Sequence, residues 1–511
     1  MRLKPKMILS DILSVSLALF IVTSLVVAQH TATHPKARVK PLALGPRVND
    51  VTSRLERDIP AMLTEADVPG LSIALVRNGE VSWQHAFGVK DSKTKEPVTD
   101  STVFEAASLS KPVFAYAVMK LVDSGKFDLD KPLNQYLPGD YDVGPDARLA
   151  QVTARRVLSH TTGFPNWRGQ DTTLKIYFTP GDRFSYSGEG FVYLSKVIEH
   201  ITGEQFNDFM KRMVFDPLGM SSSSYIWRAD YDALKTARHN RVGLPTPQNK
   251  PLKANAAASL HTTAQDYARF IAAMLNGAGL KKQTLTQMLT PQIKVDEGGS
   301  NTTGRPADKL SPNVSWGLGV GLQTTADGLS FWHWGDNGDS KAYFVAFEKQ
   351  KTGVVVFANS ANGLSFMPEL VAEAVGGQQP ALVWLKYESY KSPPRRLLRS
   401  ILASGAEAAL REYRSSRDRR FTSERINEDQ MNRLGYDLLG RKRMKDAIEV
   451  FKLNVEDYPQ SSNTYDSLGE AYMLDGNKEL AIKNYERSVE LNPNNATGIE
   501  ALKKLREDKK E

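Results

Sequence analysis

The sequence of 511 residues contains no cysteine, which excludes disulfide bonds, thiolate metal sites, thiol catalysis and anchoring through a lipid-modified cysteine. After the N-terminal segment it also has no apolar run long enough to cross a membrane. Hydrophobic residues at 41% and charged residues at 24% are ordinary for a globular protein, so neither a disordered nor a fibrous chain is expected. A chain of this length predicts two or three folded units rather than a single core.

The N-terminal residues 1–28 have the pattern of an export signal. Three basic side chains in the first six residues precede an apolar stretch at 12–27, and small residues precede the expected cleavage after Ala28. An uncleaved membrane anchor remains the alternative, because the apolar stretch is long for a signal core and short for a membrane span. Both interpretations put the folded part outside the cytoplasm, in a periplasm or the extracellular space, after a linker at residues 29–47.

The positive charge is concentrated in one segment. The formal net charge is +8, and residues 381–421 alone contain ten Lys or Arg against four Asp or Glu. A solvated helix face explains this excess, and weak contact with an anionic membrane or cell-wall polymer is the alternative. No nucleic-acid-binding motif accompanies the basic segment, so a nucleic-acid partner is not expected.

Residues 48–378 alternate between strand-like and helix-like patterns. Two pairs of β-rich runs indicate hairpins, the first of them around Asn78-Gly79, and the four expected strands are Leu71–Arg77, Glu80–Gly88, Tyr343–Glu348 and Gly353–Asn359. Apolar residues spaced three and four apart predict helices between the hairpins, at Pro112–Ser124, Phe191–Ile201 and Ala264–Leu275. This order predicts an α+β fold, with an antiparallel sheet flanked by helices and an all-helical part.

Residues 426–508 contain an internal repeat with a period of 34 residues. The matched positions are Leu434 and Leu468, Gly435 and Gly469, Ala447 and Ala481, Phe451 and Tyr485, and Pro459 and Pro493. Small residues where two helices approach and a proline after the second helix resemble tetratricopeptide repeats, which implies a C-terminal all-α module. Residues 379–425 are then a basic helical linker or a degenerate repeat that caps the module. Such repeats imply a surface for a protein partner, or else they only extend the preceding unit.

Ser108-Leu109-Ser110-Lys111 forms an SxxK step before Pro112. Residues three apart share one face of a helix, so the amine of Lys111 can reach the hydroxyl of Ser108. Because proline is best tolerated near a helix start, Ser108 is expected at the helix N-terminus, where negative charge is stabilised. A serine nucleophile then requires that burial or a neighbouring positive charge lower the pKa of Lys111. Taken alone, the same letters are more often a capping serine with a surface lysine.

Further segments strengthen the nucleophile interpretation. Over residues 51–376 the sequence resembles the superfamily of serine β-lactamases, penicillin-binding DD-peptidases and related esterases, in particular its class C-like branch. The matching segments are Phe104–Lys111, Leu129–Leu133, Tyr136–Pro138, Val157–Pro165 and Tyr186–Gly188. The resemblance implies that Ser108 is the nucleophile, that Lys111 is its base partner and that Tyr186 is the second proton-transfer residue. His160 is expected to be structural, and Tyr193 competes with Tyr186 but lies inside the following helix.

Two segments of the sequence compete for the third motif of the family. Lys351-Thr352-Gly353 spells the family's KTG triad, but it falls between two expected strands, where lysine and glycine suit an exposed turn. By position, the resemblance assigns the triad to His333-Trp334-Gly335, as in branches that include D-amino-acid peptidases and esterases. His333 then supports Tyr186 or binds the substrate. The resemblance also implies an oxyanion hole from the backbone N–H groups of Ser108 and Asp336, with Gly335 beside it.

These elements predict an exported serine hydrolase that acts through an acyl-enzyme. Gly188 stands where β-lactamases and DD-peptidases carry an Asn, and His333 lacks the permanent charge of a lysine, so a short acyl ester or a D-amino-acid peptide is favoured over a β-lactam. The absence of a GxSxG elbow argues against a lipase-type hydrolase, and without an HExxH pattern neither a metal nor another cofactor is expected. The alternative is a non-catalytic scaffold or binding protein that uses its repeats for a protein partner.

Overall fold

The structure, a computed structural model, describes residues 48–305, 308–417 and 425–507. The expected export signal and linker at residues 1–47 lie outside the described residues. Among the helices that are described, none combines the length and the apolar character needed to cross a membrane.

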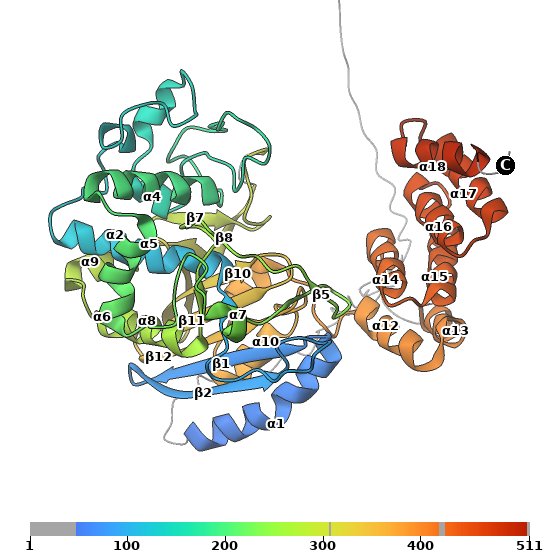
Figure 1. Cartoon of the computed structure of the whole chain (residues 1–511), viewed down its shortest axis with the longest axis horizontal. Coiled ribbons are helices and arrows are strands. Elements are labelled where there is room, and N and C mark those ends of the chain that lie inside the picture. The colour runs from blue at the N-terminus through green and yellow to red at the C-terminus, as the bar shows by residue number, and fades with distance from the viewer. Residues whose placement is uncertain (1–47, 306–307, 418–424, 508–511) are drawn as a thin grey trace, which may run out of the picture. The chain divides into compact units, whose positions relative to one another are not determined.

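One eight-stranded sheet forms the centre of the N-terminal unit (Figure 1), and each of its strand pairs is antiparallel. The strand order is β2-β1-β12-β11-β10-β9-β8-β7. The strands span Gly70–Arg77 (β1), Glu80–Gly88 (β2), Ile293–Asp296 (β7), Leu310–Trp316 (β8), Gly321–Thr325 (β9), Gly328–Asp336 (β10), Lys341–Phe347 (β11) and Thr352–Ala358 (β12). Two short pairs complete the β-structure: β3 (Phe104–Glu105) with β6 (His261–Thr262), and β4 (Arg238–His239) with β5 (Pro245–Thr246).

Helices cover both faces of this sheet. The α-helices of the unit are Val48–Ala66 (α1), Ser110–Asp123 (α2), Ala154–Leu158 (α3), Gly188–Thr202 (α4), Phe206–Met210 (α5), Asp216–Leu218 (α6), Tyr231–Leu234 (α7), Ala264–Asn276 (α8), Lys282–Met288 (α9), Met367–Ala374 (α10) and Pro380–Leu385 (α11). Three 3₁₀ turns and one π-helical turn lie between them, at Ala107–Leu109 (η1), Leu133–Gln135 (η2), Ala147–Gln151 (η3) and Lys211–Phe215 (η4).

Alternate residues of strand β1 point into two different cores. Ala74 and Val76 pack with α2, α4 and α8 on one face of the sheet, whereas Ile73 and Leu75 pack with α1, α10 and α11 on the other. Side chains alternate across a strand, so a strand covered on both faces is apolar throughout, and every residue of β1 is buried. The predicted antiparallel sheet flanked by helices, with an all-helical part, is confirmed.

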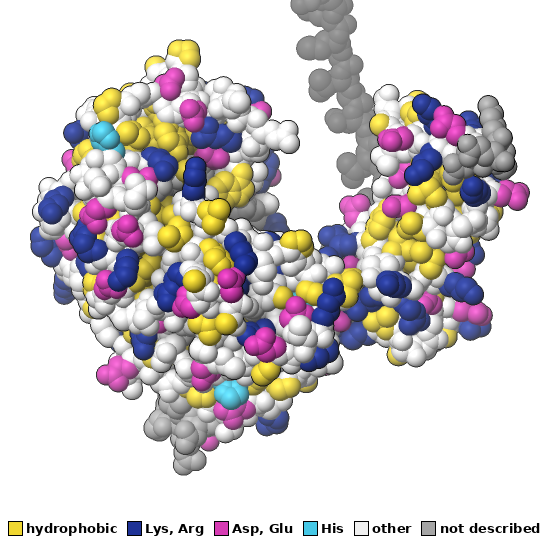
Figure 2. All heavy atoms as spheres, in the orientation of Figure 1, with side chains coloured by type: hydrophobic (Ala, Val, Ile, Leu, Met, Phe, Trp, Pro, Cys, Tyr) yellow, Lys and Arg dark blue, Asp and Glu magenta, His cyan; other side chains and the backbone are white. Residues whose placement is uncertain are grey.

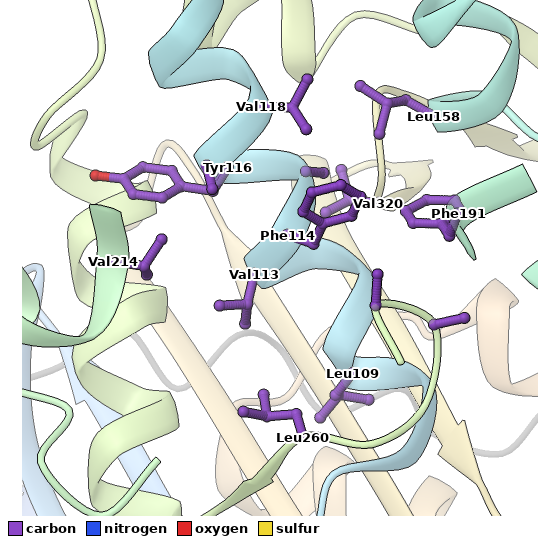
Figure 3. Packing of buried hydrophobic residues seen from close by; sticks show 14 of the residues in the cluster. Leu109, Val113, Phe114, Tyr116, Val118, Leu158, Phe191, Val214, Leu260 and Val320 are labelled. Atoms are coloured by element: carbon purple, nitrogen blue, oxygen red, sulfur yellow. The ribbon is translucent and has the colours of Figure 1, made fainter. Parts of the chain in front are cut away.

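Helix α2 lies in the middle of the first core (Figure 3). Leu109 at its start and Val113, Phe114 and Val118 along it pack among apolar side chains from other segments, including Phe191. Eleven of its fourteen residues are buried, as expected for a helix that is apolar on all sides. The helix is therefore a fixed support for the residues at its N-terminus.

The packing of the N-terminal unit continues beyond residue 378, where the sequence analysis ends the domain. Ala381, Leu382 and Trp384 of α11, together with Tyr390, belong to the core on the α1 side of the sheet. The indole N–H of Trp384 also donates to the carbonyl oxygen of Asp296 at 2.7 Å. This short helix therefore buries its apolar side chains against the sheet, and the predicted domain end at residue 378 stays a prediction.

The C-terminal part is entirely helical in its described residues. Its helices are Pro393–Ser404 (α12), Ala406–Arg417 (α13), Glu428–Gly440 (α14), Met444–Asp457 (α15), Ser462–Leu474 (α16), Lys478–Leu491 (α17) and Ala496–Glu507 (α18). They share one apolar core, to which α12 and α13 contribute as a further helix pair. Apolar and charged side chains of both signs are interspersed on the face of this part in view (Figure 2).

The 34-residue period has a direct packing reason. A Cβ atom at Gly435 would lie 2.4 Å from the ring of Phe451, and one at Gly469 would lie 3.1 Å from the ring of Tyr485. Each glycine thus lets the first helix of a pair approach an aromatic ring on the second. This arrangement of paired helices is the one that the predicted tetratricopeptide-like module requires.

Candidate active site

Ser108 lies in the short turn η1, which leads directly into α2. It is half-buried, between the fully buried Ala107 and Leu109. Ala107 has a φ of +50°, a left-handed conformation that a side chain disfavours and that surrounding structure must hold. The hydroxyl of Ser110 donates to the Ala107 carbonyl at 2.6 Å and accepts the N–H of Leu260 at 3.0 Å. These two hydrogen bonds of the Ser110 side chain therefore fix the turn that carries Ser108.

Lys111 is fully buried beside that hydroxyl. Its Nζ lies 3.1 Å from Ser108 Oγ and donates to the carbonyl of Ala257 at 2.9 Å. Burial lowers the pKa of Lys111 well below its ordinary value, because the charged ammonium loses its hydration. The one carbonyl contact orients the amine, and a neutral amine in this position can accept the proton of Ser108.

The side chain of Tyr186 lies beside the amine of Lys111. The Lys111 amine lies over its ring, 4.7 Å from the centroid, and the ring stacks on His160 at 4.2 Å. Burial raises the pKa of Tyr186, while its interaction with the Ser108 hydroxyl opposes that effect. Its hydroxyl is buried, and within the part of the chain that the structure describes it has no hydrogen bond of regular geometry.

His160 supports the segment that carries Tyr186. Its Nδ1 accepts the backbone N–H of Ser187 at 3.0 Å, and the ring is fully buried. Burial, with the nearby amine of Lys111, lowers the pKa of His160 well below its ordinary value, so the ring is neutral. These contacts are of the structural kind that the sequence analysis expected for His160.

The competing candidate, Tyr193, lies elsewhere on α4. Its ring is buried and stacks on Tyr141 at 3.9 Å. The structure brings Tyr186, and not Tyr193, against the amine of Lys111.

His333 lies on β10, in the core that also holds Trp316 and Trp334. Its Nδ1 contacts the carbonyl of Trp334 at 2.7 Å. A carbonyl can only accept, so Nδ1 carries the proton and Nε2 is left as a buried acceptor, for which the described residues provide no donor. Burial and the nearby Lys111 amine lower the pKa of His333 to about 3. His333 is therefore a neutral group at physiological pH and acts through hydrogen bonding rather than through charge.

Gly335 brings the end of β10 against the nucleophile turn. A Cβ atom there would lie 2.4 Å from the carbonyl oxygen of Ala106 and 3.2 Å from Cβ of Ala107. Only glycine permits this approach without displacing the backbone. The end of the strand that carries Asp336 thus lies next to the turn of Ser108, and the oxyanion role of the two backbone N–H groups stays a prediction.

The carboxylate of Asp336 is held from two sides. It forms an ion pair with Lys341, its neighbour across the β10–β11 pair, and accepts the hydroxyl of Tyr387 at 2.6 Å. Tyr387 is about one-third exposed, and its environment includes the charge of Asp336 and the hydroxyl of Tyr186. It follows α11, so a residue from beyond the expected domain end reaches the site.

The structure separates Lys351 from this cluster. Lys351 has a φ of +49° and lies in the turn between β11 and β12, with its amine on the carbonyl of Leu275. Strand register puts this turn beside Ser330, at the opposite end of β10 from Asp336.

Two residues of the site region were not identified from the sequence. Tyr387 gave no signal because it follows the segment that resembles the family. Trp167, which is 45% exposed, lies against Gly188 in an irregular segment where no periodicity applies. Within the described residues, no group of three or more His, Asp or Glu side chains is arranged to hold a metal ion.

An antiparallel sheet thus supports a serine, a buried lysine and a tyrosine that lie together, a set of side chains suited to acyl transfer. A family model described as β-lactamase matches residues 54–375, and a tetratricopeptide-repeat model matches residues 462–495. The chain belongs to the β-lactamase family, which confirms the resemblance seen in the sequence.

Solved structures support the same fold, and a known protein is similar in sequence. Protein flp of Staphylococcus aureus (strain COL) is 23% identical over 343 residues, which is 63% of this chain and 66% of that protein. The chain thus spans slightly less than two thirds of that relative's length. An octameric penicillin-binding protein homologue from Pyrococcus abyssi superposes with a TM-score of 0.53 and 23% identity, over 68% of this chain and 82% of that one. A class C β-lactamase mutant gives 0.54 and 19%, over 64% and 96%.

Proposed function

We propose that this protein is an exported serine hydrolase that cleaves an ester or amide through an acyl-enzyme on Ser108. The observation that carries the proposal is the buried Lys111 amine, 3.1 Å from the Ser108 hydroxyl. A lysine kept neutral by burial is a base, and a serine at the start of a buried helix is a nucleophile whose developing negative charge the helix N-terminus favours.

The proposed reaction has two steps. Ser108 Oγ attacks the substrate carbonyl while Lys111 accepts its proton, and the N–H groups of Ser108 and Asp336 stabilise the oxyanion. Tyr186 passes a proton to the leaving group, whose bond to the carbonyl carbon then breaks. Water attacks the resulting acyl-enzyme by the reverse proton path and releases the acid.

The proposed substrate class is based on two features that the site lacks: an amide side chain at residue 188 and a positive charge at residue 333. Gly188 has no amide side chain for an acylamide, and His333 is neutral, since burial lowers its pKa to about 3. A missing polar contact of this kind costs about 1–3 kcal/mol in a transition state, or about five- to 150-fold in rate. Short acyl esters and D-amino-acid amides are therefore the proposed substrates, ahead of β-lactams.

A fluorophosphonate probe tests the proposal directly. The wild-type protein should be labelled covalently and should hydrolyse p-nitrophenyl acetate, and Ser108→Ala should lose both properties while keeping the wild-type melting temperature. Nitrocefin on the same preparation tests the substrate class. Nitrocefin turnover equal to ester turnover, and lost in Ser108→Ala, would restore a β-lactamase as the first interpretation. Equal labelling of the Ser108→Ala variant would refute the nucleophile.

The remaining proposals concern partners and location. The tetratricopeptide-like helices support binding of a protein partner, since stacked helix pairs of this kind build extended surfaces. Export remains a proposal based on residues 1–28, as does weak contact of the basic segment 381–421 with an anionic membrane or cell wall. Fractionation of cells that produce the full chain, with N-terminal sequencing, tests both cleavage after Ala28 and the compartment.

A further inference from the structure

Trp167 is a large side chain, 45% exposed, whose two neighbours are tied down. The side-chain and backbone oxygens of Asn166 both accept the N–H of Gly188 at 3.0 Å. The guanidinium of Arg168 pairs with the carboxylate of Glu189 at 2.9 and 3.0 Å. Both anchors are in the first turn of α4, so the backbone that carries Trp167 is fixed to the start of that helix.

The indole of Trp167 fills the position that a side chain at residue 188 would take. A Cβ atom on Gly188 would lie 2.7 Å from Cη2 of Trp167 and 2.9 Å from the Asn166 carbonyl. Both distances are too short for any side chain. Gly188 is two residues beyond Tyr186, whose ring lies under the Lys111 amine. An aromatic ring therefore covers the side-chain position of residue 188, close in the chain to Tyr186.

An exposed indole held this rigidly is suited to binding. Its large apolar surface remains in contact with water in the free protein, so covering it with a flat apolar group is favourable. Little conformational entropy is lost, because the neighbouring residues already fix the loop. The neighbouring cation, Arg168, already pairs with the carboxylates of Glu189 and Asp142, so the face is not suited to an anionic group.

We propose that Trp167 is the acyl-specificity residue of the site and that it selects acyl groups carrying an aromatic ring by stacking. This proposal rests on the proposed serine hydrolase function and deepens it. The preferred substrates are then neutral aryl-acyl esters or amides, such as phenylacetyl derivatives.

The test compares p-nitrophenyl phenylacetate with p-nitrophenyl acetate, which share a leaving group. The quantity measured is the ratio of their kcat/KM values. Wild type should prefer the phenylacetyl ester by about tenfold or more, and Trp167→Ala should reduce that ratio about tenfold, mainly through KM. Trp167→Phe should restore most of the ratio, because it keeps an aromatic face. Trp83→Ala is the matched control, since Trp83 lies on β2, four strands away from β10, and should keep the wild-type ratio.

Each outcome separates this inference from the proposed function. Hydrolysis of both esters with the same ratio in wild type and Trp167→Ala would overturn the specificity role and leave the hydrolase intact. Absence of ester hydrolysis and of fluorophosphonate labelling in the wild-type protein would overturn both. If Trp167→Ala loses its fold, Trp167→Leu provides the comparison, because a folded Leu variant with the wild-type ratio contradicts aromatic stacking.

Discussion

The two ends of strand β10 differ in their neighbours, although each lies near a segment that resembles the third motif of the family. These segments are His333–Gly335 at one end and Lys351–Gly353 at the other. At one end, Gly335 touches the nucleophile turn and Asp336 pairs with Lys341. At the other end, Ser330 lies in register with the strand residues that flank the Lys351 turn. Six residue steps of about 3.3 Å put about 20 Å between these ends. The letters of a motif therefore decide less than the place where the fold puts them.

A comparison of Lys111 with Lys351 also shows that position matters more than residue type. Lys111 is fully buried with Nζ beside the Ser108 hydroxyl, and burial lowers its pKa. Lys351 is half-buried, and its amine is engaged by the carbonyl of Leu275. A lysine becomes a base only where the fold removes its water, so only the first of these positions is suited to proton transfer.

The largest expected effect is that of Lys111→Met, which keeps the side-chain length and removes the base. We expect kcat/KM for p-nitrophenyl acetate to fall by about 10²–10⁴, the range for loss of a positioned general base. In wild type, the rate should fall as pH is lowered through the reduced pKa of Lys111, because protonation removes the acceptor. Wild-type activity in this variant would contradict the proposed role.

The same variant has a stability consequence of known sign. The pKa of Lys111 is lowered in the folded state, so between that value and about 10.5 the unfolded chain binds more protons. The buried amine therefore destabilises the fold within this window, and its cost shrinks as pH rises toward 10.5. Lys111→Met should be more stable than wild type at pH 7, by a margin that narrows at pH 10. A thermal melt at the two pH values measures this difference.

The next effect is that of His333→Ala, at the catalytic end of β10. Loss of its buried Nε2 acceptor should reduce kcat/KM by about 10–100-fold. Because burial lowers the pKa of His333 to about 3, the wild-type rate should show no histidine titration from this residue between pH 5 and 8. A limb near pH 6.5 that disappears in His333→Ala would contradict the neutral state.

Much of this fold could be predicted from local patterns in the sequence. The hairpin around Asn78-Gly79 and the helix after Ser108 depend on neighbouring residues, and both are present as β1–β2 and α2. The Ser108, Lys111 and Tyr186 cluster followed from resemblance, whereas the burial that makes Lys111 neutral depends on the packing of the whole domain.

The contacts that the sequence did not predict are long-range ones between irregular segments. Tyr387 meets Asp336 across 51 positions, and Arg168 meets Glu189 across 21. No periodicity links such residues, so the support of the oxyanion strand and the position of Trp167 required the structure. The packing of α11 on a sheet formed by distant strands could not be predicted for the same reason.

A smaller effect is expected from Tyr387→Phe, which removes the hydrogen bond to the Asp336 carboxylate. That carboxylate also accepts the N–H of Gly338 at 2.8 Å, so its orientation is tied to the backbone that carries the proposed oxyanion donor. We expect kcat to fall about three- to tenfold with little change in KM, since one hydrogen bond contributes about 1 kcal/mol. A change confined to KM would instead indicate that Tyr387 binds substrate directly.

The smallest effect is expected from Lys351→Ala. This variant decides which end of β10 belongs to the active site. The Lys351 amine donates to the carbonyl of Leu275, and the turn lies about 20 Å along the sheet from Asp336. We expect kcat/KM within threefold of wild type and a modest loss of stability of about 1 kcal/mol from the lost hydrogen bond. Parallel assays of Lys351→Ala and His333→Ala on p-nitrophenyl acetate give the order directly. If Lys351→Ala were the more impaired of the two, the KTG letters would mark the true site and the catalytic end of β10 would be misassigned.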